Sequence, residues 1–174
     1  VALLTALVFV LQFFFSGFHL GTFTVSVVLV PIVLGAALAG PLAGLWLGLV
    51  FGVAVLASGD AALFYGFNAF GTIVTVLLKG ALAGFVTGLV YRALARVNRT
   101  LSSAVSAVVC PIVNTGVFLI GCRVFFWDLL GQMAQEGYGN NVVAFAFLGL
   151  VGANVLFEVG FNLILAPVIL RILD

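Results

Sequence analysis

Charged side chains are scarce in this 174-residue chain. Lys, Arg, Asp and Glu make up 6% of the residues, while hydrophobic residues make up 65% and mean hydropathy is +1.42. A soluble domain carries about a quarter charged residues. The composition therefore excludes a soluble protein and a charged surface for nucleic acid, and indicates that nearly the whole chain lies in lipid.

Residues that build catalytic, metal and cofactor sites are also few. The chain has one His and two Cys, with no CxxC, HExxH or GxxxxGK motif. Cys110 and Cys122 fall in one expected helix, where a rise of about 1.5 Å per residue separates them by roughly 18 Å, too far for a disulfide. A membrane enzyme needs an activated nucleophile or a metal-bound water. We therefore expect no enzyme activity and no cofactor in this chain.

Long apolar runs fill most of the sequence. Crossing a bilayer takes about 20 residues, so the chain predicts an all-α membrane protein: one domain over residues 1–174, built as a compact bundle of six transmembrane helices. The expected spans are residues 1–15, 24–39, 42–57, 72–95, 101–126 and 142–173. An aromatic loop is expected at 64–70 and the longest loop at 127–141. Because the first apolar run begins at Val1, we expect further residues before it.

The distribution of arginines predicts the orientation. Arg92, Arg96 and Arg99 lie around the turn between the fourth and fifth spans, and Arg171 lies near the end of the sixth. Positive charge favours the cytoplasmic side, so both termini are expected inside a cell membrane. Aromatic residues gather at the opposite ends, where they form either an interfacial belt or a lid over a pocket.

Glycines recur at every fourth position in the third and fourth expected spans. The two stripes are Gly40, Gly44, Gly48 and Gly52 in one, and Gly80, Gly84 and Gly88 in the other. Such stripes let helices approach closely. They pack either against neighbouring helices of this chain or against another membrane subunit. Ala2 and Ala6 form a further pair of small residues in the first span.

Two ionisable residues, Lys79 and Glu158, lie deep inside expected spans. A charge there costs about 3 kcal/mol on insertion scales, so such residues face a protein interior or a polar pathway. Asn154, Glu158 and Asn162 share one helical face, and Asn114 lies in the middle of the fifth span. Either Lys79 pairs with Glu158 while the amides join helices, or these groups together bind a small polar solute.

Two polar residues nearer the expected outer surface extend this candidate binding set. Arg123, near the outer end of the fifth span, either binds an anionic solute or pairs with Asp128. Asn68, in the expected aromatic loop, offers an amide. Gln12 of the first span is a further residue that can face the bundle.

Several short motifs carry a resemblance to a known family. They are PIVLGA at 31–36, GPLAG at 40–44, CPIVNTG at 110–116 and the Ala2/Ala6 pair. With the six-span plan, they resemble the substrate-binding S component of an energy-coupling factor (ECF) vitamin transporter, most closely its pantothenate-type branch. The resemblance covers essentially the whole chain.

The resemblance implies a function and partners. An S component binds a vitamin from outside the cell, docks on a transmembrane T component and releases the vitamin inside as two partner ATPases, which bind ATP and Mg, turn over. Docking would use Ala2, Ala6, Gly40 and Gly44, and the vitamin would lie between the fourth, fifth and sixth spans. We expect the plasma membrane of a bacterium as its location.

Pantothenate suits the candidate residues chemically. Its carboxylate needs a cation, which Lys79 or Arg123 supplies, and its amide and hydroxyls need partners such as Asn68, Asn114 and Asn154. Glu158 leaves room for a neutral or cationic vitamin instead. The competing interpretation is a secondary transporter or channel in which Lys79 and Glu158 line the path, although paired interrupted helices typical of inverted-repeat carriers are not found.

Overall fold

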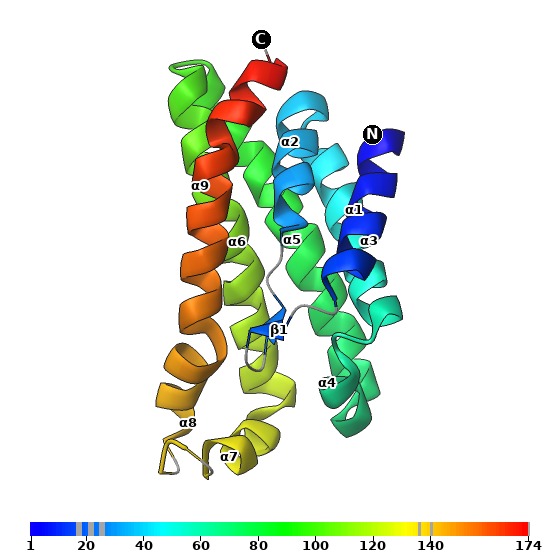
Figure 1. Ribbon diagram of the computed structural model, residues 1–174, viewed down its shortest axis with the longest axis vertical. Helices are drawn as coiled ribbons and strands as arrows, with labels where there is room; N and C mark the ends of the chain where they lie inside the picture. Colours follow the sequence, from blue (N-terminus) through cyan, green and yellow to red (C-terminus); the bar gives the residue numbers. More distant parts are fainter. Residues whose placement is uncertain (17–18, 21–22, 25–26, 136, 140, 174) are drawn as a thin grey trace.

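A computed structural model describes residues 1–16, 19–20, 23–24, 27–135, 137–139 and 141–173. They form an elongated bundle of roughly parallel and antiparallel helices (Figure 1). The main helices are α1 (Ala2–Phe15), α2 (Leu29–Ala39), α3 (Pro41–Ser58), α5 (Ala69–Ala95), α6 (Arg99–Phe125) and α9 (Ala153–Leu173). The shorter elements are the strands β1 (His19–Leu20) and β2 (Phe23–Thr24), the helices α4 (Ala62–Phe67), α7 (Trp127–Gln135) and α8 (Val142–Ala144), and the π-helix η1 (Phe145–Gly152).

Each expected span contains a helix, and in the part of the chain that the structure describes four segments are long and apolar enough to cross a membrane. These are α3, α5, α6 and residues 142–165, with mean hydropathy of 2.0–2.1. The helices α1 and α2 are apolar but have 14 and 11 residues. The chain is therefore a multi-pass helical membrane protein with four candidate spans and two shorter apolar helices. The count of six spans stays a prediction.

Three boundaries differ from those expected from the sequence. Thr24 belongs to β2, which pairs antiparallel with β1, and α2 begins only at Leu29. The expected loop at 64–70 is mostly helical, because α4 runs to Phe67 and α5 begins at Ala69, and the expected loop at 127–141 contains helix α7. In α7 the four-residue spacing of Leu130 and Ala134 places both on one buried face, a helical pattern short enough to be taken for a loop.

Glycine, proline and asparagine set the sharpest helix ends. Gly40 ends α2 with φ of 90°, a conformation that favours glycine, and Pro41 opens α3 at once. Asn98 precedes α6, and its side-chain oxygen accepts a hydrogen bond from the Leu101 backbone N–H at 3.1 Å. These turns reverse the chain within a few residues and keep consecutive helices antiparallel.

The glycine stripes bring α3 and α5 into backbone contact. A Cβ added at Gly48 would lie 1.9 Å from the carbonyl oxygen of Gly80, and one added at Gly84 would lie 2.0 Å from that of Gly44. No side chain fits there, so the stripes pack within this chain. Gly40 and Gly44 are buried, whereas Ala2 and Ala6 are exposed. Of the expected docking set, only the two alanines thus remain on the surface of the chain.

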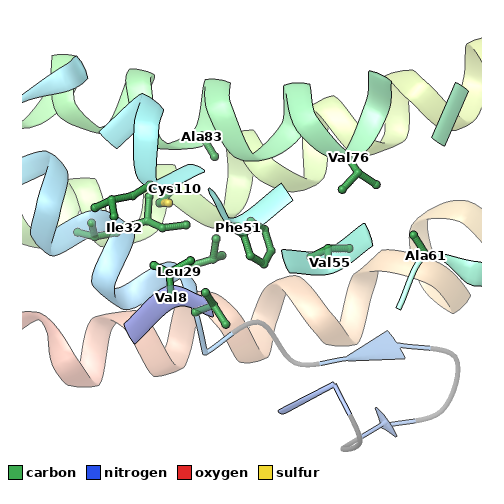
Figure 2. Packing of buried hydrophobic residues seen from close by; sticks show 12 residues of the cluster. Val8, Leu29, Ile32, Phe51, Val55, Ala61, Val76, Ala83 and Cys110 are labelled. Carbon is green, nitrogen blue, oxygen red and sulfur yellow. The ribbon is translucent and has the colours of Figure 1, made fainter. Parts of the chain in front are cut away.

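Apolar side chains fill the space around this contact in one cluster that joins five helices. Figure 2 shows Val8 of α1, Leu29 and Ile32 of α2, Phe51 and Val55 of α3, Val76 and Ala83 of α5, and Cys110 of α6. A second cluster joins α6 and α7 to η1 through Cys122, Phe126, Leu130, Phe145 and Leu150. In lipid this close packing, rather than exclusion of water, is what holds helices together.

The two ends of the bundle differ in charge. The N-terminus, the C-terminus and the turn between α5 and α6 lie at one end (Figure 1). Arg92, Arg96 and Arg99 flank that turn. The elements α4, α7 and α8 lie at the other end. The cytoplasmic location of the arginine end remains a prediction from the positive-inside rule.

The α3–α5 contact predicts that adding one methyl group at Gly48 strongly lowers the stability of the protein. Gly48→Ala places a Cβ against the backbone of Gly80, so we expect it to destabilise the protein by about 1–3 kcal/mol or more. The measurement is the midpoint of thermal unfolding in detergent. The control is Gly116→Ala in α6, where an added Cβ meets no atom within 4 Å. Equal midpoints for the two variants would contradict the backbone contact.

Candidate functional site

A cavity of about 360 Å³ lies among α3, α5, α6 and the segment from η1 to α9. This volume is in the usual range for small-molecule sites, about 300–1,000 Å³. Residues of both hydrophobic clusters form its walls, among them Phe51, Val76, Phe126 and Leu150. Asp60, between α3 and α4, and Leu63 and Phe64 of α4 line it at the end of the bundle away from the arginines.

Lys79 of α5 supplies a cation to this cavity. Its Nζ lies 5.7 Å from the ring centre of Phe51 and 5.3 Å from that of Phe118, both cavity residues. Aromatic faces attract an ammonium group at this distance. Glu158 is near enough to interact electrostatically with Lys79. Lys79 itself is one of the residues that line the cavity.

Three further cavity residues present oxygen atoms that lack a hydrogen-bond partner among the described residues. These atoms are Thr75 Oγ1 of α5, Asn114 Oδ1 of α6 and Asn154 Oδ1 of α9. Leaving a buried polar atom unsatisfied costs about 1–3 kcal/mol. The three residues that carry these oxygens all line the same cavity.

Asn154 is held by a second residue of the polar stripe on α9. Its Nδ2 donates to Oε1 of Glu158 at 3.3 Å, and Glu158 is 2% exposed. Glu158 itself is not among the cavity-lining residues that the structure describes. The sequence placed both residues in the binding set, and the structure places Asn154 on the cavity wall with Glu158 behind it.

Asn162, also predicted to bind substrate, instead joins two helices. Its Nδ2 donates to the carbonyl oxygen of Ala107 in α6 at 3.2 Å. In a regular helix that carbonyl accepts from the N–H four residues later, but residue 111 is proline and has no N–H. Asn162 thus satisfies a carbonyl that Pro111 leaves without its helical partner.

Asn68 and Arg123 also lie outside the cavity lining. Asn68 is the N-cap of α5, and its Oδ1 accepts from the backbone N–H of Gly71 at 2.9 Å. Arg123 is exposed, with its guanidinium 4.5 Å from the ring centre of Trp127. Neither side chain lines the cavity. Asn68 is used to cap the start of α5, and Trp127 holds the Arg123 guanidinium at the surface.

The structure adds polar cavity residues to the candidate set: Gln12, which the sequence suggested only as facing the bundle, and Thr72 and Thr75, which the sequence analysis missed. Gln12 of α1, barely exposed, donates from Nε2 to Asp60 Oδ2 and, at 3.3 Å, to Ser58 Oγ, which ties α1 to the end of α3 beside the cavity. Thr72 and Thr75 line the cavity on α5 with Lys79. Their spacing of three and four residues is the helical-face signal that would have found them.

Comparison with known families agrees with this arrangement. The family model described as ECF transporter, substrate-specific component, matches residues 1–170. The chain belongs to this family. No curated protein and no solved structure gives a significant match. Membership makes the chain a substrate-binding subunit of an ECF transporter and implies association with the T component and ATPases of an ECF module.

This S component offers no cluster of metal ligands in the described part of the chain. No three His, Cys, Asp or Glu side chains gather there in a way that would hold a metal ion. The site is thus described by one ammonium group, hydroxyl and amide groups, and apolar walls.

The tie between Asn162 and Ala107 predicts a coupling with Pro111. Asn162→Leu should cost about 1 kcal/mol in the wild-type chain, because the Ala107 carbonyl loses its partner. In a Pro111→Ala background residue 111 regains its N–H, so the same change should cost less than half as much. Equilibrium unfolding of the four variants in mixed detergent measures both costs. Equal costs in the two backgrounds would contradict the proposed tie.

Proposed function

We propose that this S component binds a vitamin that carries an anionic group and several hydrogen-bond donors, and that the vitamin is pantothenate. The observation that carries the proposal is the set of residues that line one cavity: Lys79 with its amino group, and the polar residues Thr75, Asn114 and Asn154. Family membership supports the class of function, and the cavity chemistry supports the class of solute.

Pantothenate matches these groups one by one. Its carboxylate pairs with Lys79, where a charge-assisted hydrogen bond is stronger than a neutral one. Its two hydroxyls and its amide N–H are donors for the oxygens of Thr75, Asn114 and Asn154. Its dimethyl carbon fits against an apolar wall such as Phe51, Val76 and Phe118. Asp60, on the cavity wall, disfavours a second anionic group there.

The transport cycle that we propose begins outside the cell. The cavity lies toward the end of the bundle opposite the arginines, which the positive-inside rule makes the extracellular end of a bacterial plasma-membrane protein. Release inside would follow docking on the T component and ATP hydrolysis by two partner ATPases. The exposed pair Ala2 and Ala6 on α1 is the proposed docking contact within this chain.

A titration with pantothenate and its alcohol analogue pantothenol tests the ligand. We expect Lys79→Met to weaken pantothenate binding about 10- to 100-fold, because a hydrogen bond to a charged group contributes about 1.5–3 kcal/mol. Pantothenol has no carboxylate, so the same variant should change its affinity much less. Isothermal titration calorimetry in detergent measures both affinities.

Arg123→Ala is the control for this titration. It removes the other proposed cation, which stacks on Trp127 outside the cavity, and should leave pantothenate affinity unchanged. Tight binding of a different vitamin by the wild type would overturn the pantothenate assignment but keep the transporter class. Loss of binding in the Arg123 variant alone would overturn the role of Lys79.

The partners are tested by uptake in cells. An ECF S component depends on its module, so labelled pantothenate should accumulate only when the T component and the ATPases are co-expressed. An ATPase variant without its Walker lysine should abolish accumulation while leaving binding to the S component intact. Uptake by this chain alone would favour a secondary transporter.

A further inference from the structure

The wall of the cavity carries one acidic and one basic residue, at different depths. Among the lining residues that the structure describes, these are Asp60 and Lys79. Asp60 lies between α3 and α4, at the end of the bundle away from the arginines. Lys79 lies inside α5, ten positions after its first residue, which is about 15 Å along a helix. The acidic residue is therefore near the outer end of the cavity and the basic residue is deep in the bundle.

The packing of α3 on α5 fixes this difference in depth. Gly48 of α3 meets Gly80 of α5, and the two helices run antiparallel. From that contact α3 continues for ten residues to its end at Ser58, and α5 extends back for eleven residues to its start. The end of α3 and the start of α5 therefore lie at about the same level. Asp60, just after α3, lies at that level, and Lys79 lies at the level of the glycine contact.

A neutral side chain holds the Asp60 carboxylate beside the cavity. Gln12 of α1, which also lines the cavity, donates from Nε2 to Asp60 Oδ2. Asp60 is partly exposed, and an aspartate with access to water is ordinarily ionised at neutral pH. An amide donor stabilises the charged form further and carries no charge itself. This hydrogen bond therefore fixes the position of the carboxylate and leaves its negative charge in place.

We infer that Asp60 is a specificity-determining residue: it keeps the neutral end of the solute toward the outer end of the cavity and rejects solutes with a second anionic group there. The inference rests on the proposed function in placing the solute carboxylate at Lys79. A reversed solute would bring its carboxylate beside Asp60, where like charges repel. A phosphate ester on the neutral end would bring about two negative charges there. The S component thus takes the free vitamin and excludes its phosphate ester.

The first test compares pantothenate with its phosphate ester on the terminal hydroxyl. The wild type should bind the ester at least about 100-fold more weakly, because two negative charges face the Asp60 carboxylate. Asp60→Asn keeps the shape of the side chain and an oxygen that accepts from Gln12, but removes the charge. In this variant the affinity ratio of the two probes should fall about tenfold or more. Isothermal titration calorimetry in detergent measures both affinities.

Ser58→Ala is the matched control. Ser58 Oγ also accepts a hydrogen bond from Gln12 Nε2, at 3.3 Å, but Ser58 carries no charge and lies outside the cavity lining that the structure describes. Its removal weakens the same tie to α1, so we expect the affinity ratio of the two probes to stay as in the wild type. An unchanged ratio in Asp60→Asn, or an equal fall in both variants, would overturn the role of Asp60.

A second readout needs no vitamin. Ala62 is exposed and lines the cavity close to Asp60, whereas the native Cys110 and Cys122 are buried. In Ala62→Cys, a cationic methanethiosulfonate reagent should react faster than an anionic one. Adding Asp60→Asn should lower the ratio of the two rates about five- to tenfold, because the carboxylate attracts one reagent and repels the other. The ionisation of the thiol affects both rates equally, so the ratio reports the charge at the cavity.

The two readouts separate the inference from the proposed function. If the wild type binds no pantothenate while the rate ratio falls in Asp60→Asn, the proposed ligand is wrong and the exclusion of anions by Asp60 stands. If pantothenate binds tightly while Asp60→Asn changes neither ratio, the ligand stands and the inference is overturned.

Discussion

The backbone contact between α3 and α5 is the constraint on which the rest of the structure depends. Carbonyl groups of Gly44, Gly48, Gly80 and Gly84 occupy the space that side chains would need. In lipid, helices associate through such close packing. Two residues next to this helix contact then line the cavity. Phe51 lies one helical turn after Gly48 in α3, and Lys79 is the sequence neighbour of Gly80 in α5. The ammonium group of Lys79 lies over the ring of Phe51.

Polar groups inside the bundle fall into two kinds. Some complete the structure, as when Asn162 satisfies the carbonyl that Pro111 leaves without its helical partner, or when Gln12 donates to Asp60 and Ser58. Others, such as those of Lys79, Asn114 and Asn154, belong to residues that line the cavity. Because an unsatisfied polar group is costly in an apolar interior, the second kind marks where a polar solute belongs.

The long apolar runs made the main helices predictable, because length and hydropathy alone define a membrane span. The short helices α4 and α7 were not predicted, since segments of six and nine residues with a glycine inside look the same in a loop and in one or two helical turns. The late start of α2 at Leu29 depends on the pairing of β1 with β2, a tertiary contact without a strong local signal.

The candidate site was predictable for residues whose polar side chains are costly to expose to lipid, because that cost decides that they face the interior of the bundle. Lys79, Asn114 and Asn154 are too polar to face lipid, and all three line the cavity. The same argument predicted correctly that Asn162 is buried. It did not predict that Asn162 contacts Ala107, because helical spacing shows which residues share a face and does not show which helix packs against that face. Arg123 and Asn68 sit near helix ends, where a polar side chain has other uses, and Thr75 was overlooked because threonine is common in apolar spans.

The central claim is that the Lys79 ammonium binds the carboxylate of the solute inside the cavity. The most direct measurement is a solid-state NMR dipolar recoupling experiment between ¹⁵Nζ of lysine, of which Lys79 is the only one in the chain, and ¹³C-carboxylate pantothenate bound to the protein in lipid. The account predicts clear dephasing from an ion pair with nitrogen and oxygen about 2.8 Å apart. Pantothenate that is bound but shows no coupling to Lys79 would contradict it.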